Sequence, residues 1–510
     1  MKIQKLLVRI VSLALIAVFL PTVAMADTWY LEDGSITVSA TESGQNVSQG
    51  GVTRADSAPV IRNRDSSTST TNTVTIKADA GQTANATLED TNIDTTGGSE
   101  NAYAPGEAAV KTEGEGNVNL NVELDNTLKS GYGHAGVEKG NGGSLTIGSE
   151  SGSGQLVATG GHGGAGIGSG DGHTTGIHNV GNITVTGGDI FAIGNGGGAG
   201  IGGGWACSAT DITITGGNVT AEARQEGPQY VGGAGIGGGG YQNKYYGNGT
   251  NIKITGGHVT AIGGNCSAGI GGSMYSDGEN ISISDAEVIA VGGTGSAGIG
   301  GGNGGGEGKN ISISGSANVK AAGGESENQI GKGAAIGSGG TNSYQGGPVI
   351  DAAEGEADTS GLSPDGKVER FTPGTTFGIP QPKPRSSFPK PAPDPVAVEE
   401  EPQPVKAALY RVIDDAGKAL PVETKQEDGV LLLTAQANIA ILEGAISGLQ
   451  TLQGRGIDTI TFTNGTISVS FSLAEVIVKG ASSDIYRLTL SGGEASFTLA
   501  DADITALLGK

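Results

Sequence analysis

The sequence predicts an all-β protein built mainly as a parallel β-helix. A phrase of the type Ala-Gly-Ile-Gly-Gly recurs along the chain, with 27 to 37 residues between its central apolar positions. Glycine supplies 96 of the 510 residues and aromatic residues only 4%, which suits narrow coils better than a large mixed core. Repeats of this length bury their apolar faces only by stacking on one another. Their central residues are Val110, Val137, Ile167, Ile201, Ile236, Ile270, Ile299 and Ile336.

Each repeat also contains two short segments in which apolar and polar residues alternate. One resembles Asn-Ile-Ser-Ile at 280–283, and the other resembles Val-Ile-Ala at 288–290. Alternation with period two among β-branched residues predicts strands with one buried face. Glycine pairs often lie between the two segments, where the chain must turn. Three short strands and three bends in about 30–35 residues describe one coil of a β-helix.

Stacked coils place equivalent side chains about 4.8 Å apart, so each strand position becomes a column along the solenoid. A ladder of stacked amides is expected from Asn182, Asn251, Asn280 and Asn310, interrupted by Asp211. Two buried columns are expected beside it: Ile183, Ile212, Ile252, Ile281 and Ile311, and Val185, Ile214, Ile254, Ile283 and Ile313.

Four regions follow one another along the chain. Residues 1–26 have a basic start, an apolar run and the small-residue site Ala24-Met25-Ala26, which predicts a secretory signal peptide. Residues 27–375 are the predicted β-helix, with a cap at its first coil because an open sheet edge must be covered. Residues 376–405 are rich in proline and predict an extended linker. Residues 406–510 remain for a separate domain.

The last region predicts a small α+β accessory domain. Apolar residues recur at helical spacing from Ile439 to Leu452. The pair Asn464-Gly465 between strand-like runs predicts a hairpin, and a second hairpin is expected over 485–499. Ser472 followed by Glu475 resembles the start of a short helix.

The net charge and the predicted signal peptide exclude some classes of function. The formal net charge is −23, and removing Lys2, Lys5 and Arg9 with the signal peptide leaves −26. This balance argues against a nucleic-acid partner, since no basic patch would neutralise phosphates. No later segment resembles a membrane span, so we expect a secreted or cell-surface protein that does not insert in a membrane after signal cleavage. Cys207 and Cys266 fall in different loops, which does not favour a disulfide.

Aromatic residues gather on one track of loops. Trp205, Tyr241 and Tyr275 lie four, five and five positions after the central isoleucine of consecutive repeats, and Tyr245 and Tyr246 extend the second loop. Aromatic faces stack on the apolar C–H faces of sugar rings, so these five residues are the predicted carbohydrate-binding site. Two alternatives stay open, in which the rings cover glycine backbone or contact another protein.

The sequence supports a metal site or a catalytic site less than it supports a carbohydrate-binding site. His162, His173 and His178 with Asp171 match no recognised metal spacing, so no metal site is predicted. No cofactor is predicted either. Ca²⁺ is the alternative, through loop carboxylates, although the repeat that binds calcium in other solenoids is absent. The carboxylates in question are Asp277, Glu279, Asp285 and Glu307.

A polysaccharide lyase would need acids on adjacent coils with a basic residue in reach, and Arg224 and Lys244 are isolated. A glycosidase would need two carboxylates about 5–10 Å apart, for which Asp189 and Asp211 are the candidates. Each of these also suits an ordinary turn. No nucleophile, base and orienting residue converge, so a non-enzymatic protein is expected.

The phrases Ala-Gly-Ile-Gly-Gly and Asn-Ile-Thr-Ile-x-Gly-Gly within residues 165–340, with the run 117–148, resemble repeats of exported bacterial glycine-rich surface proteins. Many of these are labelled carbohydrate-binding domain-containing proteins. The resemblance spans residues 73–340 and implies a right-handed β-helix with polysaccharide binding rather than cleavage. No binding residue of that family transfers to a numbered position here.

The expected function is therefore non-catalytic binding of a polysaccharide by a secreted or surface-displayed β-helix. Its partners would be the polysaccharide and, in the cell envelope, the cell wall or other surface modules. The alternatives are a structural adhesin or stalk and, behind it, an enzyme of the polysaccharide-lyase type. Each alternative predicts a different response to a panel of glycans.

Overall fold

The computed structural model describes residues 27–97, 106–172, 179–224, 231–241, 247–326, 329–343 and 348–383. It also describes residues 410–509, apart from 416–419, 421, 428, 436, 455–456, 481–483, 492 and 501. The signal peptide predicted over residues 1–26 lies outside this set, as does most of the predicted linker. The chain divides into two compact units, residues 1–392 and 393–510, and each is described by itself.

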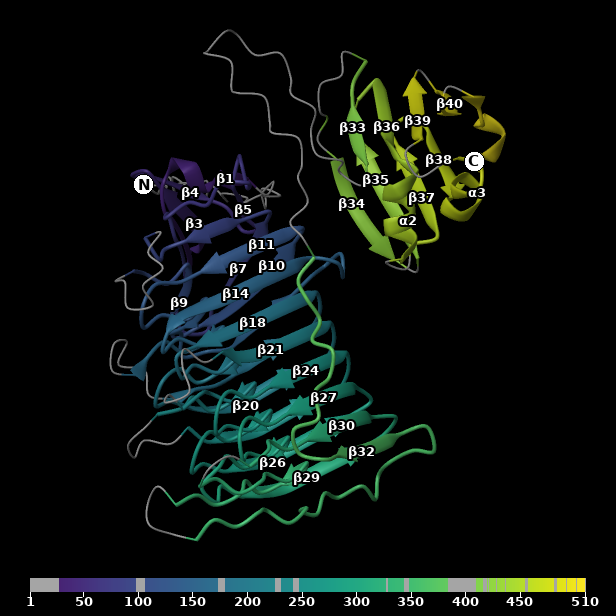
Figure 1. The fold of residues 1–510 in the computed structure, drawn as a ribbon. Coiled ribbons are helices and arrows are strands. Elements are labelled where there is room, and N and C mark those ends of the chain that lie inside the picture. The colour runs from purple at the N-terminus through teal and green to yellow at the C-terminus, as the bar shows by residue number, and fades with distance from the viewer. Residues whose placement is uncertain are drawn as a thin grey trace, which may run out of the picture. The chain divides into compact units, whose positions relative to one another are not determined.

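The first unit is a parallel β-solenoid whose coils each contribute to three sheets (Figure 1). We name the sheets A, B and C. Sheet A carries the Asn-Ile-Ser-Ile phrases. In spatial order its strands are β1 (Thr28–Tyr30), β5 (Val60–Arg62), β7 (Thr83–Glu89), β10 (Asn117–Glu123), β13 (Leu145–Gly148), β17 (Ile183–Val185), β20 (Ser208–Ile214), β23 (Gly249–Ile254), β26 (Gly278–Ser284) and β29 (Gly308–Ser314), with β16 (Asn179–Val180) pairing with β20.

Sheet B carries the Ile-Gly pairs of the repeated phrase. In the middle of the solenoid each of its strands has only two residues, an isoleucine and a glycine, and these pair with the same two residues of the next coil. In spatial order they are β31 (Ile336–Gly337), β28 (Ile299–Gly300), β25 (Ile270–Gly271), β22 (Ile236–Gly237), β19 (Ile201–Gly202), β15 (Ile167–Gly168), β12 (Val137–Lys139), β9 (Val110–Gly114), β6 (Val74–Ala78), β2 (Ile36–Thr41), β3 (Gly44–Gln49) and β4 (Val52–Ala55).

Sheet C carries the Val-x-Ala phrases. Their Val and Ala side chains point into the core, and the residues between them point outward. In spatial order its strands are β8 (Asn92–Asp94), β11 (Asp125–Lys129), β14 (Gln155–His162), β18 (Asp189–Asn195), β21 (Asn218–Arg224), β24 (His258–Ile262), β27 (Glu287–Val291), β30 (Asn318–Ala322) and β32 (Lys367–Phe371).

The predicted columns are confirmed by the strand registers. Ile212 pairs with Ile252, which pairs with Ile281 on the next coil, and all three are fully buried. The isoleucines of the repeated phrase pair in the same way through sheet B, as Ile201 does with Ile236. Identical aliphatic side chains from successive coils therefore form one continuous core, which holds the solenoid together through burial of apolar area.

The amide ladder forms from Asn310 to Asn251, and the Asp211 carboxylate is its last acceptor, as the expected interruption at Asp211 implies. Asn310 donates to Asn280 at 3.0 Å, Asn280 donates to Asn251 at 3.1 Å, and Asn251 donates to the Asp211 carboxylate at 3.0 Å. These residues have φ between 51° and 56°, a left-handed conformation that Asn and Asp adopt more easily than other side chains. A carboxylate only accepts hydrogen bonds, so Asp211 receives the last donor of the ladder.

Both ends of the solenoid are covered. At the first coil, β2 turns back into the antiparallel strands β3 and β4, and the Trp29 indole donates to the buried Asp56 carboxylate at 2.8 Å. At the last coil, the Glu354 carboxylate accepts hydrogen bonds from the backbone of Ala335 and Ile336. These contacts supply partners to sheet edges that would otherwise be open to another chain.

The second unit is the predicted α+β domain, with its own buried core. We name its two sheets D and E. The predicted hairpins over 459–472 and 485–499 are present, as are the helices α2 (Ile446–Gly454) and α3 (Leu473–Ile477). Sheet D contains β33 (Arg411–Ile413), β36 (Ile439–Ala445), β39 (Ile485–Ser491), β40 (Glu494–Leu499) and β41 (Ala502–Asp503), and sheet E contains β34 (Val422–Glu427), β35 (Val430–Ala435), β37 (Thr459–Thr463) and β38 (Ser468–Ser472).

The helix expected from Ile439 to Leu452 is wrong over its first half. Residues 439–445 form β36, which lies between β33 and β39 in sheet D, and only then does α2 begin at Ile446. Four successive residues of β36, from Ala440 to Glu443, are buried, so both of its faces are covered. Hydrogen bonding of β36 to a strand on each side stabilises the extended conformation more than the spacing of its apolar residues favours a helix. In the described residues of both units, no helix has the length and apolar character needed to cross a membrane.

Candidate functional site

Four rings from four neighbouring coils make a continuous row, which we call the ring row: Tyr132, His162, Trp205 and Tyr241. Tyr132 and His162 stack at 5.6 Å between centroids with an interplanar angle of 10°. His162 meets the edge of Trp205 at 5.8 Å, and Trp205 meets Tyr241 at 5.2 Å. His162 is buried inside the row, whereas the other three rings are partly exposed. The row therefore presents aromatic surface along the direction in which the coils stack.

The bends on either side of sheet B place these rings at one corner of the solenoid. Tyr132 and His162 each lie five residues before the central apolar residue of their coil, Val137 or Ile167. Trp205 follows its own isoleucine, and its backbone N–H donates to the Gly163 carbonyl at 2.7 Å. This hydrogen bond joins two bends from neighbouring coils. Trp205 lies in the bend after β19, and Gly163 lies in the bend before β15 of the preceding coil. The two sets of rings meet because the coil closes there.

Glycine makes room beneath the rings. A side chain at Gly196 would overlap the His162 ring, and one at Gly197 would lie 3.1 Å from the Trp205 ring. The rings therefore rest on bare backbone, which has φ of 55° at Gly196 and 111° at Gly197. This packing agrees with the expectation that aromatic residues cover glycine backbone. It also fixes the ring positions without another bulky side chain on that side.

A buried carboxylate lies close to the row. Asp171 is 1% exposed, and its Cβ faces Gly163 beside Trp205. Burial and the negative charge of Asp171 both raise the pKa of Tyr132 above its usual value. Burial also raises the pKa of Cys207, behind Trp205, to about 11, with a further contribution from Asp171. This corner is negative and poorly hydrated, which disfavours an anionic ligand.

The predicted site residues are only partly brought together. Trp205 and Tyr241 are in contact within the row, whereas Tyr245 and Tyr246 lie outside the described residues. Tyr275 makes contacts of another kind: its ring covers Gly304 and its hydroxyl donates to Asn342 at 3.0 Å. It also packs against a small cluster of buried residues, namely Val231, Cys266, Met274 and Ile330. Tyr275 thus supports the next bends of the solenoid.

Sequence reasoning missed Tyr132 and His162 as members of the row. The signal was present, since both stand five residues before the central apolar position of their repeats. Only the closed coil of the structure shows that rings five residues before the central apolar residue meet rings four or five residues after it. Of the histidines considered above for a metal site, His173 and His178 lie outside the described residues. Among the residues that are described, no three His, Cys, Asp or Glu side chains are grouped to hold a metal.

Two of the carboxylates considered for Ca²⁺, Asp277 and Asp285, already have partners. Asp277 accepts from Lys309 at 2.7 Å and from the Glu307 backbone at 2.8 Å, and Asp285 accepts from Ser316. Asp189 and Asp211 lie on different sheets, C and A, so they do not form a facing pair. Both cysteines are buried thiols, Cys207 beside Trp205 and Cys266 in the cluster under Tyr275.

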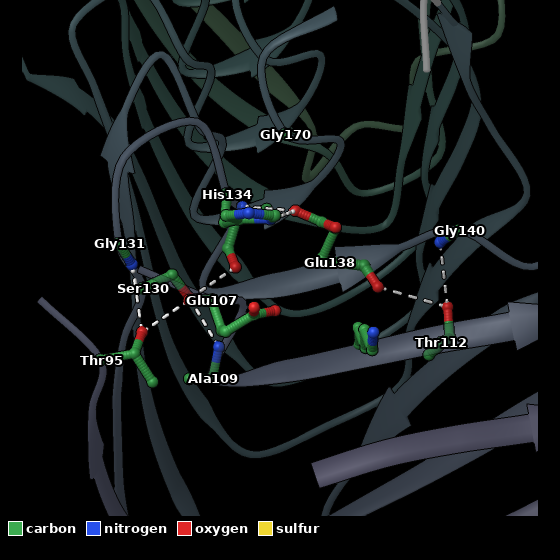
Figure 2. A network of polar contacts seen from close by, with 12 residues as sticks. Thr95, Glu107, Ala109, Thr112, Ser130, Gly131, His134, Glu138, Gly140 and Gly170 are labelled. Carbon is green, nitrogen blue, oxygen red and sulfur yellow. Dashed lines mark hydrogen bonds and ion pairs between the residues drawn. The ribbon is translucent and has the colours of Figure 1, made fainter. Parts of the chain in front are cut away.

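The loop that carries Tyr132 is held by a network of polar contacts (Figure 2). Ser130 accepts from the Ala109 backbone at 2.9 Å and donates to the Ala135 carbonyl at 2.7 Å. The His134 imidazole lies 2.9 Å from the Glu138 carboxylate, which also accepts from the Ala135 backbone. These contacts join the two ends of the loop to each other and tie its start to the preceding coil, so Tyr132 projects from a fixed backbone.

This network predicts a pH-dependent contribution to stability. The hydrogen bond to Glu138 outweighs the effect of burial and, with the nearby charge of Glu107, raises the pKa of His134 above its usual value. The contribution is therefore fully present below the unfolded pKa of about 6.5, and it is lost as pH rises through the folded pKa. We expect His134→Gln to destabilise the protein by less than about 1 kcal/mol at pH 5.5, and by less still at pH 8.5. Thermal unfolding of both proteins at the two pH values measures this. A difference that grows with pH would contradict it.

Comparison with known proteins supports the repeat architecture. Residues 212–240 and 252–274 match the model of a family described as beta helix repeat. These residues cover consecutive strands of sheets A, B and C, together with the bends between them. Searches of the curated proteins and of the solved structures found no match.

Proposed function

We propose that this β-helix protein is exported and binds a neutral polysaccharide, without cleaving it, through the ring row. The observation that carries this proposal is the unbroken contact of four rings over neighbouring coils, three of them partly exposed. A linear glycan that lies along the stacking direction would meet one ring after another. Its C–H faces would pack on aromatic surface that the glycine floor already holds in place.

The charges favour a neutral ligand. The mature chain is strongly acidic, and Asp171 lies buried beside Tyr132 and Trp205. A uronic acid polymer would be repelled by this charge, whereas a neutral sugar carries no charge to be repelled. Export is inferred from the signal peptide predicted at the start of the sequence, and binding without catalysis is supported by the existing partners of Asp189 and Asp211.

The test is retention on insoluble neutral polysaccharides by the mature protein and by Trp205→Ala, Tyr241→Ala and the double variant. Two stacking rings at about 1 kcal/mol each predict affinity about 30-fold weaker in the double variant. Tyr30→Ala is the matched control, because Tyr30 is a partly exposed ring in the first coil, where it contacts Arg64. A circular dichroism spectrum of each variant shows whether the fold is kept.

Tryptophan fluorescence gives a second readout. The chain has two tryptophans, and Trp29 is buried in the first coil, so Trp29→Phe leaves Trp205 as the only reporter. A soluble oligosaccharide of the retained glycan should change its emission. Equal retention of wild type and double variant would reject the ring row as the site. No retention on any glycan would favour the stalk, which the packing of rings on glycine also allows.

A further inference from the structure

The chain does not leave the solenoid at its last coil. After β32 it turns back and runs in extended form over the outer face of sheet C, from Thr372 to Lys383 (Figure 1). We call residues 372–383 the strap. Near its start, the Gly374 N–H donates to the Gly323 carbonyl at 2.9 Å, and Phe377 meets Phe371 edge to face at 5.0 Å. Its composition predicts an extended spacer for most of this segment, whereas the structure holds it against the solenoid.

The end of the strap is held by side chains from neighbouring strands of sheet C. Gln155 on β14 accepts the Lys383 N–H at 2.8 Å and donates to the Lys383 carbonyl at 3.2 Å. The Lys383 ammonium pairs with Asp189 on β18 at 2.5 Å, and Asn218 on β21 donates to the other Asp189 oxygen at 2.7 Å. The backbone and the charge of one lysine are thus both recognised.

Burial on sheet C shows what the strap covers. Thr220 and Thr260 occupy successive outward positions, yet each is only 6% exposed, and Phe191 in the same column is 7% exposed. Outward threonines on sheet A, such as Thr213, are less buried. Five rungs from β30 to β14 span about 24 Å, and the nine steps from Gly374 to Lys383 reach about 28 Å when extended. The strap is therefore long enough to cross this column only if it stays extended.

We propose that Gln155, Asp189 and Asn218 form a docking site for a proline-flanked lysine, and that its occupant is Lys383 of the same chain. Docking there covers Phe191, Thr220 and Thr260 on the outer face of sheet C and moves the start of the linker away from the last coil. Prolines on both sides of Lys383 keep the backbone extended and remove N–H groups that would otherwise need partners. The site recognises the segment as other proteins recognise proline-rich peptides, through a preformed conformation of low entropy.

The proposal is tested on the full mature chain by the rate of cleavage after Phe377 and by hydrogen exchange of the Lys383 amide. Asp189→Asn and Lys383→Gln should each speed both processes about fivefold, the effect of losing one partly exposed charge pair. The triplet Pro-Lys-Pro recurs at 389–391, so Lys383→Gln is also combined with Lys390→Gln to remove the second candidate occupant. The exchanged pair Asp189→Lys with Lys383→Asp should restore protection.

Lys309→Gln is the control, because Lys309 also pairs with carboxylates but lies on sheet A. It should leave the strap protected. Unchanged cleavage and exchange in Asp189→Asn would overturn the proposal, as would a wild-type strap that exchanges like a free peptide. Protection that rises with protein concentration would also overturn it, since the occupant would then come from a second copy. Glycan retention by the ring row is a separate measurement that these variants should not change.

Discussion

Gly237→Ala should be among the most damaging single substitutions in the solenoid. Gly237 has φ of 137°, a conformation that L side chains rarely adopt, and an added Cβ would overlap the Gly271 carbonyl of the next coil. A backbone carbonyl cannot move aside without breaking the register of sheet B. We expect a loss of about 3–5 kcal/mol in the free energy of unfolding. The same position recurs as Gly168, Gly202, Gly271, Gly300 and Gly337, with φ from 130° to 144°.

Gly81→Ala separates the cost of backbone strain from the cost of the clash with the next coil. Gly81 also has positive φ, 78°, but an added Cβ would meet nothing within 4 Å. Strain alone should cost about 1–2 kcal/mol there. Urea unfolding followed by circular dichroism compares the two variants. Equal losses would show that the clash with the neighbouring coil contributes nothing, contrary to the packing described for sheet B.

Ile252→Ala should cost about 2–5 kcal/mol, because it removes three carbons from a fully buried position and leaves a cavity. Ile252 lies in the column between Ile212 and Ile281, so neither neighbouring coil can fill the space by a small side-chain movement. The loss should appear in urea unfolding. It should also appear as faster hydrogen exchange over residues 249–254, since coils depend mainly on their neighbours.

Lys253→Ala is the matched control on the same strand. Its side chain points outward and is exposed, so the change should stay within about 0.5 kcal/mol. The pair tests the alternation of β23 directly. A large effect at Lys253, or a small one at Ile252, would show that the strand presents its other face to the core.

The stacking of the solenoid follows from the sequence because each column repeats one residue type at one spacing. The sequence alone aligns Ile212, Ile252 and Ile281, since a shift by one residue would expose the whole column. The end of the amide ladder at Asp211 is also predictable, because a carboxylate accepts the hydrogen bond from Asn251 but has none to donate to the next coil. The start of α2 was misplaced because strand pairing with β33 and β39 is not visible in local spacing.

The ring row and the strap were harder to foresee for a shared reason. Tyr132 and Trp205 stand on opposite sides of the central apolar residue in their repeats, and the closure of the coil brings their positions to one corner. Lys383 meets Gln155 across 228 positions of sequence. Tyr132 and His162 share one position in their repeats, but this spacing does not show that the position meets Trp205. The contact of Lys383 leaves no periodic signal, because it depends on single side chains rather than on a column.

The constant register of the coils has a consequence for length. From β20 to β29, each coil repeats the aliphatic residues and the Ile-Gly pair of the coil before it. The register does not shift within any of these strand pairs. A whole coil is therefore an exchangeable unit: joining Asn248 directly to Gly278 would bring Ile212 above Ile281 and shorten the stack by one rung of about 4.8 Å. Insertion or loss of complete repeats in the gene can adjust the span beyond Trp205 in equal steps while leaving its immediate surroundings as they are.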